Sequence, residues 1–148
     1  MAYQVNNTSG NNRLNEQKSF GNSNNQVKVT LPSIVLDYTK DVELFNETAK
    51  KVASLIAQNR RPETKTTQMR NFYDYILDLY EQSKNKTFNE VLPFVKMTNS
   101  KVAYAKNRNH VNDEFVEMIK ICINQISTPK QLEIFKLFFE AVIGFSKK

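Results

Sequence analysis

Basic side chains are the residues of this chain whose types and spacing could do chemistry, and they are most concentrated between Pro93 and His110. This stretch reads PFVKMTNSKVAYAKNRNH and contains no Asp or Glu. Ammonium and guanidinium groups bind phosphates, and a tyrosine between them can stack on a base or pack in a core. The stretch therefore predicts a surface for a phosphate chain, unless its long stems only cover a solvated helix face. Its candidate phosphate ligands are Lys96, Lys101, Lys106 and Arg108.

A helix would place part of this stretch on one face. If Pro93 lies in the first turn, where its missing backbone donor costs nothing, the helix can run without a break to about Lys106. Residues three and four positions apart then lie one above the other. This spacing predicts a stripe of Met97, Lys101, Tyr104 and Arg108, and it leaves Val95, Val102 and Ala105 to face a core.

The positive charge of the chain is concentrated in its middle third. The net charge is +6 and the pI is near 9.4, which makes a polyanion a candidate partner. Residues 60–110 contain ten Lys or Arg against five acids, whereas the counts are six against five before them and five against five after them. We expect the positive side chains of the middle third to converge on a single surface, to which Arg60, Arg61, Lys65 and Arg70 would also belong. Arg60 and Arg61 could instead complement the negative end of a helix dipole.

The totals favour one helical domain. A chain of 148 residues with three Gly and four Pro supports one sizeable core built from helices. No apolar run approaches the roughly 20 residues that span a bilayer, and the start has no signal pattern, so we expect a cytoplasmic protein without a membrane partner. The single Cys122 can form no internal disulfide, which fits a reducing compartment.

Apolar periodicity predicts an all-α protein, with a single compact bundle of about five helices over residues 40–148. Residues 1–26 are rich in Asn and would form a flexible tail. Residues 27–39 would form an extended lead-in, either laid against the helices or paired as an edge strand. The first helix would run from Lys40 to Arg60, with Val42 and Phe45 on its apolar stripe. A second helix would begin at Thr66 or Thr67 and end near Ser83.

Capping signals mark the later helices. Thr87 followed by Glu90 has the capping-box pattern, which predicts a short helical turn before Pro93 that kinks into the basic helix. Asn112 would cap the next helix, in which Cys122 is expected to be a small buried hydrophobe. The last helix would begin with Thr128 as cap and a proline at its first position. It has more apolar surface than one stripe needs, so we expect it both at the centre of the bundle and partly buried against another chain.

The sequence has few residues that are suited to catalysis or metal binding. One histidine and one cysteine do not provide a metal site or a Cys/His nucleophile pair, and the acids are spread singly along the helices. The chain also lacks a phosphate-binding glycine loop. We therefore expect a protein that is not an enzyme and that has no metal and no cofactor. His110 is expected to contact phosphate or solvent.

Two segments resemble a known family. The segment LPFVKMTNSKVAYAKNR, from Leu92 to Arg108, is followed after one helix by LEIFKLFFEAVIGF, from Leu132 to Phe145. A PF-K-M segment, a KVAYA core followed by a basic residue, and an FFEAVI-like helix recur in this order in the small subunit of type III-A CRISPR effector (Csm) complexes. The resemblance covers roughly residues 40–148 and leaves out the Asn-rich tail.

The resemblance implies an all-helical subunit without catalytic activity. Several copies would stack as a minor filament and line the channel in which guide RNA pairs with target RNA, while cleavage belongs to neighbouring subunits. Its partners would be guide RNA, target RNA, the other subunits of the complex and further copies of itself, with a dimer as one form of the isolated protein. The RNA-facing surface would include Lys96, Lys101, Lys106 and Arg108, with Arg70, Arg60, Arg61 and Lys65 as further candidates.

Two other functions remain open on the sequence. A helical protein–protein adaptor with no direct nucleic-acid role could bind its partners through the Phe-rich last helix. A DNA-binding helical regulator would need a helix that reads bases, for which Asn99, Asn107 and Asn109 are available. Preference for a defined duplex over unrelated RNA would favour the regulator.

Overall fold

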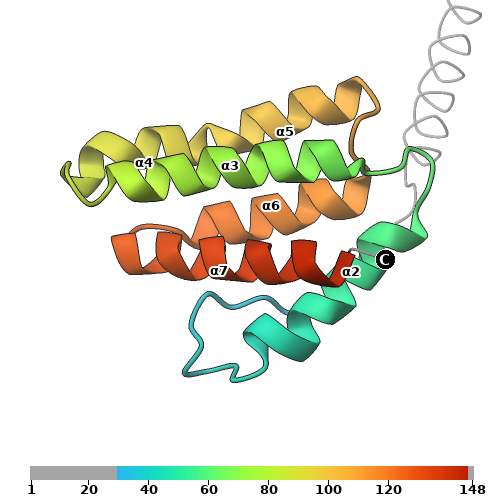
Figure 1. The fold of residues 1–148 in the computed structure, drawn as a ribbon, viewed down its shortest axis with the longest axis horizontal. Coiled ribbons are helices and arrows are strands. Elements are labelled where there is room, and N and C mark those ends of the chain that lie inside the picture. Colours follow the sequence, from blue (N-terminus) through green and yellow to red (C-terminus); the bar gives the residue numbers. More distant parts are fainter. Residues whose placement is uncertain (1–29, 147–148) are drawn as a thin grey trace, which may run out of the picture.

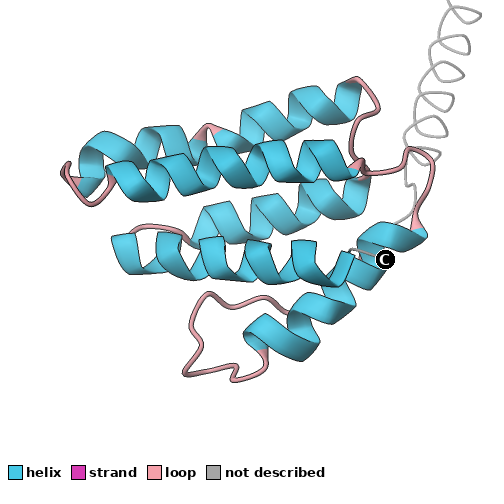
Figure 2. Ribbon diagram, in the orientation of Figure 1, coloured by secondary structure: helices cyan, strands magenta, loops and turns pink. Residues whose placement is uncertain are grey.

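The computed structural model describes residues 30–146, and every regular element within them is a helix (Figure 2). A π-helical turn, η1 (Leu44–Thr48), leads directly into α2 (Ala49–Gln58). The following helices are α3 (Thr66–Gln82), α4 (Phe88–Lys96), α5 (Thr98–Asn107), α6 (Asp113–Gln125) and α7 (Pro129–Ser146). Because α4 and α5 are separated by one residue and form a bent rod, the described chain makes five rods, and the predicted all-α bundle is confirmed (Figure 1).

Parts of the predicted organisation fall outside this range. The flexible tail predicted for residues 1–26 and the first residues of the 27–39 lead-in lie outside the described residues. None of the helices between residues 30 and 146 is long and apolar enough to cross a membrane.

Helix α7 lies at the centre of the bundle, between α3 and α2 (Figure 1). Its side chains at Phe135, Phe138 and Phe139 have no exposed surface. Phe139 packs against the rings of Phe115 and Tyr73, with centroids 6.0 and 5.8 Å apart. The predicted central position is therefore confirmed.

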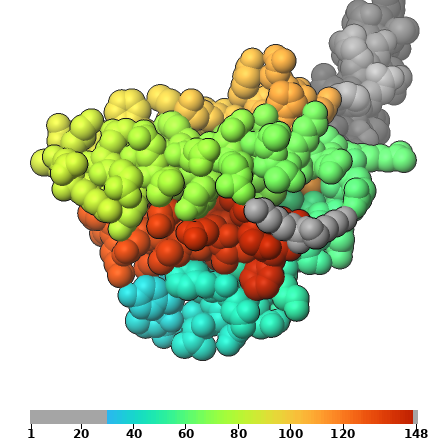
Figure 3. All heavy atoms as spheres, in the orientation of Figure 1, coloured from blue at the N-terminus to red at the C-terminus, as the bar shows by residue number. Residues whose placement is uncertain are grey.

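The fold itself covers most of the phenylalanine surface of α7, and the burial of the remaining surface against another chain stays a prediction. Figure 3 shows that α7 reaches the surface as a band beneath α3. The residues exposed or half-buried along α7 include the polar Glu133, Lys136 and Glu140. Among its phenylalanines, Phe145 alone is exposed, at 42%.

The prediction for the first helix, Lys40 to Arg60, is wrong at both ends. Its start is irregular, and Val42, which was expected on the apolar stripe, is 84% exposed. The Asp41 side chain accepts hydrogen bonds from the backbone of Glu43 and the hydroxyl of Thr48, which favours a turn over a continuing helix. The α-helix begins only at Ala49.

The other end is fixed by a contact from far along the chain. Helix α2 stops at Gln58, and Asn59 is extended, with its side chain donating to Glu114 on α6 at 2.9 Å. Arg60 and Arg61 therefore lie in the following loop and not in the last helical turn, so they do not cap the helix dipole as proposed from the sequence.

The described part of the lead-in is an extended segment laid against the helices. Ile34 and Leu36 are buried in the core. The Gln125 side chain accepts from the Leu36 backbone N–H at 2.9 Å and donates to the Ile34 carbonyl at 2.7 Å. One glutamine thus provides hydrogen-bond partners for a backbone N–H and a backbone carbonyl of this segment. No strand forms within residues 30–146.

The bent rod differs from the predicted basic helix in one respect. The capping box at Thr87 and Glu90 is present, so α4 begins five residues before Pro93. Pro93 lies in the interior of α4, not in its first turn, and the break comes later, at Met97. Pro93 is exposed, so solvent can satisfy the carbonyl that its missing N–H leaves without a partner.

The predicted starts of α6 and α7 are confirmed. Asn112 Oδ1 accepts from the Phe115 backbone N–H at 3.0 Å, which caps α6. At the start of α7, Thr128 Oγ1 accepts from the Gln131 N–H, and Gln131 Oε1 accepts from the Thr128 N–H. Both caps satisfy backbone donors that have no partner inside the helix.

Candidate nucleic-acid interface

An open groove of about 700 Å³ runs between α3 and α5. One wall contains the four residues of the predicted stripe, so their shared face is confirmed. Among the residues that the structure describes, no Asp or Glu lines the groove. The α5 wall consists of Met97, Ser100, Lys101, Tyr104, Ala105 and Arg108, the α3 wall of Gln68, Asn71, Phe72 and Tyr75, and His110 closes one end.

The two cations of the groove rest on aromatic rings. Lys101 Nζ lies 5.0 Å from the centroid of Tyr75, and the Arg108 guanidinium lies 5.7 Å from that of Tyr104. Within residues 30–146 neither cation forms an ion pair, and both are exposed. A ring steadies a cation without cancelling its charge, so both charges remain available to an anion.

Tyr75 also links α3 to the bent rod. Its hydroxyl donates to the Phe94 carbonyl at 2.8 Å. Burial, with a smaller contribution from Asp78, raises the pKa of Tyr75, so this hydroxyl stays protonated and continues to donate. The ring under Lys101 is therefore held in place from α4.

The end of α5 fixes Arg108 and His110. Asn109 has a φ of 61°, in the left-handed region. Its N–H donates to the Lys106 carbonyl, and the His110 N–H donates to the Ala105 carbonyl, both at 2.9 Å. This is the pattern of a Schellman C-cap with Asn in the place usually taken by Gly.

Lys65 lies near the His110 end of the groove. Its backbone N–H donates to the His110 carbonyl at 3.3 Å, just before α3 begins. Its side chain is exposed. A third predicted cation is thus brought close to the groove, although it does not line it.

Two predicted cations point from the bent rod toward α6 and not into the groove. Lys96 Nζ donates to the Ile123 carbonyl at 2.7 Å. Lys106 forms an ion pair with Asp113, with 3.5 Å between Nζ and Oδ1. These two side chains have partners within the fold.

Arg70 lies on another side of the molecule. It follows Gln68 by two residues, which places it on roughly the opposite side of α3 from the groove. Its charge acts on Tyr73, where it opposes the rise in pKa caused by burial and by Glu140 on α7. The groove therefore does not include Arg70.

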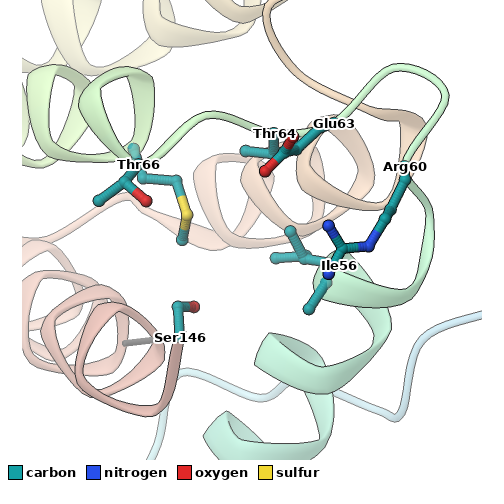
Figure 4. A pocket seen from close by; sticks show the side chains of 8 residues that line it. Ile56, Arg60, Glu63, Thr64, Thr66 and Ser146 are labelled. Carbon is teal, nitrogen blue, oxygen red and sulfur yellow. The ribbon is translucent and has the colours of Figure 1, made fainter. Parts of the chain in front are cut away.

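Arg60 belongs to a second hollow, of about 430 Å³, where α2 ends. Its guanidinium extends back beside Ile56, and Glu63 and Thr64 border the same hollow (Figure 4). Arg61 is exposed on the loop. The eight predicted cations therefore do not converge on one surface: Lys101 and Arg108 share the groove, Lys65 lies near its end, and the other five lie elsewhere.

The α3 wall was missed from the sequence because only cations were counted. Gln68, Asn71 and Tyr75 are spaced by three and four residues, which is the spacing of one helix face. That spacing could have revealed a polar stripe beside the core stripe of α3. The facing helix could not be inferred from it.

Two further features bear on metal and thiol chemistry in the described part of the chain. No group of three or more potential metal ligands occurs between residues 30 and 146. Cys122 is buried, as predicted, and burial raises the pKa of its thiol, so the thiol stays protonated.

Comparison with known proteins identifies the family of the chain. No curated protein and no solved structure matches the chain. A family model described as Csm2 Type III-A matches residues 39–148, which include both walls of the groove and all of the described helices. The chain therefore belongs to the Csm2 family and is a small subunit of type III-A Csm complexes.

Proposed function

We propose that this subunit binds the ribose-phosphate backbone of guide or target RNA through the groove between α3 and α5, without reading sequence. Lys101 and Arg108 make the direct phosphate contacts. Lys65 adds a positive charge near the His110 end of the groove. The remaining predicted cations, Lys96, Lys106, Arg60, Arg61 and Arg70, add to the positive field without lining the groove. The subunit contributes binding, and catalysis belongs to its neighbours.

One observation carries this proposal. Two exposed cations share a groove in which no described residue is acidic, although many acidic residues are exposed elsewhere on the described surface. A protein that must accept any guide should contact phosphates and sugars, and Lys and Arg do so whatever the base sequence.

Repetition of the subunit would make weak contacts sufficient. In the proposed arrangement, copies associate with one another and with the other subunits as a minor filament along the RNA, in the cytoplasm. Two or three phosphate contacts in each copy then add along one strand through multivalency. No single copy needs high affinity, which agrees with a shallow site of two cations.

The test compares two double variants with the same loss of charge. Lys101→Ala/Arg108→Ala removes the groove cations, whereas Lys84→Ala/Lys130→Ala removes two cations that are paired with Glu81 and Glu133 at 3.3 and 3.2 Å. Binding of the full chain to unrelated single-stranded RNAs is measured by fluorescence anisotropy at several salt concentrations. Circular dichroism checks that each variant is folded.

The groove variant should bind all RNAs more weakly by the same factor. Its salt slope should be smaller by about 1.4, because each phosphate contact contributes about 0.7 for single strands. The control variant should keep most of the affinity and the slope. Equal losses in the two folded variants would contradict the site, since only the total charge would then matter.

The adaptor alternative proposed that partners bind the Phe-rich face of the last helix, but Phe138 and Phe139 on this helix are not accessible. Phe138 and Phe139 are fully buried, so Phe138→Asp would disrupt the core and would not test an interface. Assembly is tested instead by purifying tagged Lys101→Ala/Arg108→Ala from its own cells. Recovery of the large subunits together with guide RNA would favour an adaptor role, whereas loss of guide RNA would favour the RNA groove.

A further inference from the structure

The two walls of the groove have different chemistry. The α5 wall carries Lys101 and Arg108, whereas the α3 wall presents the neutral amides of Gln68 and Asn71. Within residues 30–146 neither amide side chain makes a hydrogen bond to another protein group, although many other amides of the fold do. These two amides are therefore free to bind a ligand in the groove.

A phosphate does not use the full capacity of an amide. A side-chain amide has an NH₂ donor and a carbonyl acceptor, whereas a phosphate diester only accepts hydrogen bonds. The hydroxyl at the 2′ position of ribose both donates and accepts, and its presence distinguishes RNA from DNA. An amide wall is thus complementary to ribose in a way that a basic wall is not.

The two walls can bind the two parts of one strand. If the phosphates face Lys101 and Arg108, the sugars of a strand lying along the groove face the α3 wall. We propose that Gln68 and Asn71 hydrogen-bond to ribose 2′-hydroxyls and give the groove a preference for RNA over DNA. This inference rests on the proposed function, because it assumes that the strand lies in the groove.

The expected size of the preference is modest. One net hydrogen bond changes an equilibrium constant by roughly 2-fold to 12-fold. Two contacts in an open groove should therefore give RNA an advantage of about tenfold over DNA of the same sequence. Gln68→Ala/Asn71→Ala should lower RNA affinity by about that factor and leave DNA affinity unchanged. Alanine is a better helix former than either residue, so the variant should fold.

The experiment uses the full chain and three probes of one mixed sequence: single-stranded RNA, single-stranded DNA and 2′-fluoro RNA. The 2′-fluoro strand keeps an RNA-like sugar but cannot donate from the 2′ position, so it should bind like DNA. A matched control, Asn85→Ala/Asn89→Ala, removes two exposed amides outside the groove and should change none of the affinities. Homopolymers of adenine and uracil complete the set.

The outcomes separate this inference from the proposed function. Equal losses on RNA and DNA in Gln68→Ala/Asn71→Ala would overturn it, as would full affinity for the 2′-fluoro strand. A loss confined to the adenine homopolymer would also overturn it, because the amides would then be reading a base edge. If Lys101→Ala/Arg108→Ala changes no affinity, the proposed function itself fails, whatever the amide variant does.

Discussion

Replacing Asn112 by Asp is a sharp test of how the end of α2 is held against the start of α6. Asn and Asp are equivalent as helix caps, so the cap at α6 alone predicts almost no change. Asn112 is fully buried, however, and its Nδ2 donates to the carbonyls of Ile56 at 2.8 Å and Asn59 at 2.9 Å. A carboxylate keeps the cap to Phe115 but loses both donors and directs a charge at two carbonyl oxygens.

The magnitude follows from these contacts. Losing two net hydrogen bonds costs about 2 kcal/mol, and leaving buried carbonyls opposite a buried carboxylate adds at least about 1 to 2 kcal/mol. We expect Asn112→Asp to lower the free energy of unfolding by about 3 to 5 kcal/mol. Asn112→Ser keeps a cap without the charge and should cost about 2 kcal/mol. The loss in Asn112→Asp should shrink at low pH, where the carboxyl is protonated and regains a donor.

The assay is urea unfolding followed by circular dichroism, with Asn85→Asp in an exposed turn as the control. The control should stay within about 0.5 kcal/mol of the parent chain. If Asn112→Asp were equally neutral, Asn112 would be an ordinary cap. A role for Asn112 in tying the end of α2 to the start of α6 would then be refuted.

Three further changes have defined outcomes. Asn109→Ala should lower the free energy of unfolding in urea by about 1 kcal/mol, whereas Asn109→Gly should keep or raise it, because the position is left-handed; equal effects would contradict the cap. Burial raises the pKa of Cys122 above its ordinary 9.0, so the unfolded chain loses this proton first and stability should fall as the pH rises past that value. Cys122→Ala should lack this part of the slope in urea titrations, and the native thiol should resist iodoacetamide until unfolding. Lys96→Met removes the hydrogen bond to the Ile123 carbonyl and should cost about 1 kcal/mol, with a much smaller loss of RNA affinity than Lys101→Ala/Arg108→Ala; an equal loss of affinity at full stability would instead make Lys96 an RNA ligand.

The helices that the sequence predicted best have ends marked by local side chains. The caps at Asn112 and Thr128 act on backbone groups three residues away, so their signal is contained in a few adjacent residues. The same holds for the stripe on α5, because the spacing of Lys101, Tyr104 and Arg108 determines a shared face once the helix forms. These features depend on helix geometry alone.

The features that sequence reasoning missed depend on distant partners. The end of α2 is set by Asn59 and Glu114, which are 55 positions apart. Lys96 is drawn from the predicted surface by a carbonyl 27 positions away. The sequence shows how many cations the middle third contains, but not which of them already have a partner in the fold.

The break between α4 and α5 shows how such partners shape the site. Two start signals compete in the sequence, the capping box at Thr87 and the proline at position 93, and the box starts the helix because it satisfies backbone donors directly. Proline would disturb the turn that precedes it, yet the break lies four residues beyond it, at Met97.

The contacts around the break explain its position better than the proline does. In a continuous α-helix the Phe94 carbonyl would accept from the N–H four residues later, but here it accepts from the hydroxyl of Tyr75 on α3. On the other side, Lys96 is bound to the end of α6. Because the ring of Tyr75 also supports Lys101, the contact that accompanies the bend also positions a groove cation. The basic wall is therefore oriented by α3 and α6, and changes on those helices should alter RNA binding without removing a single charge.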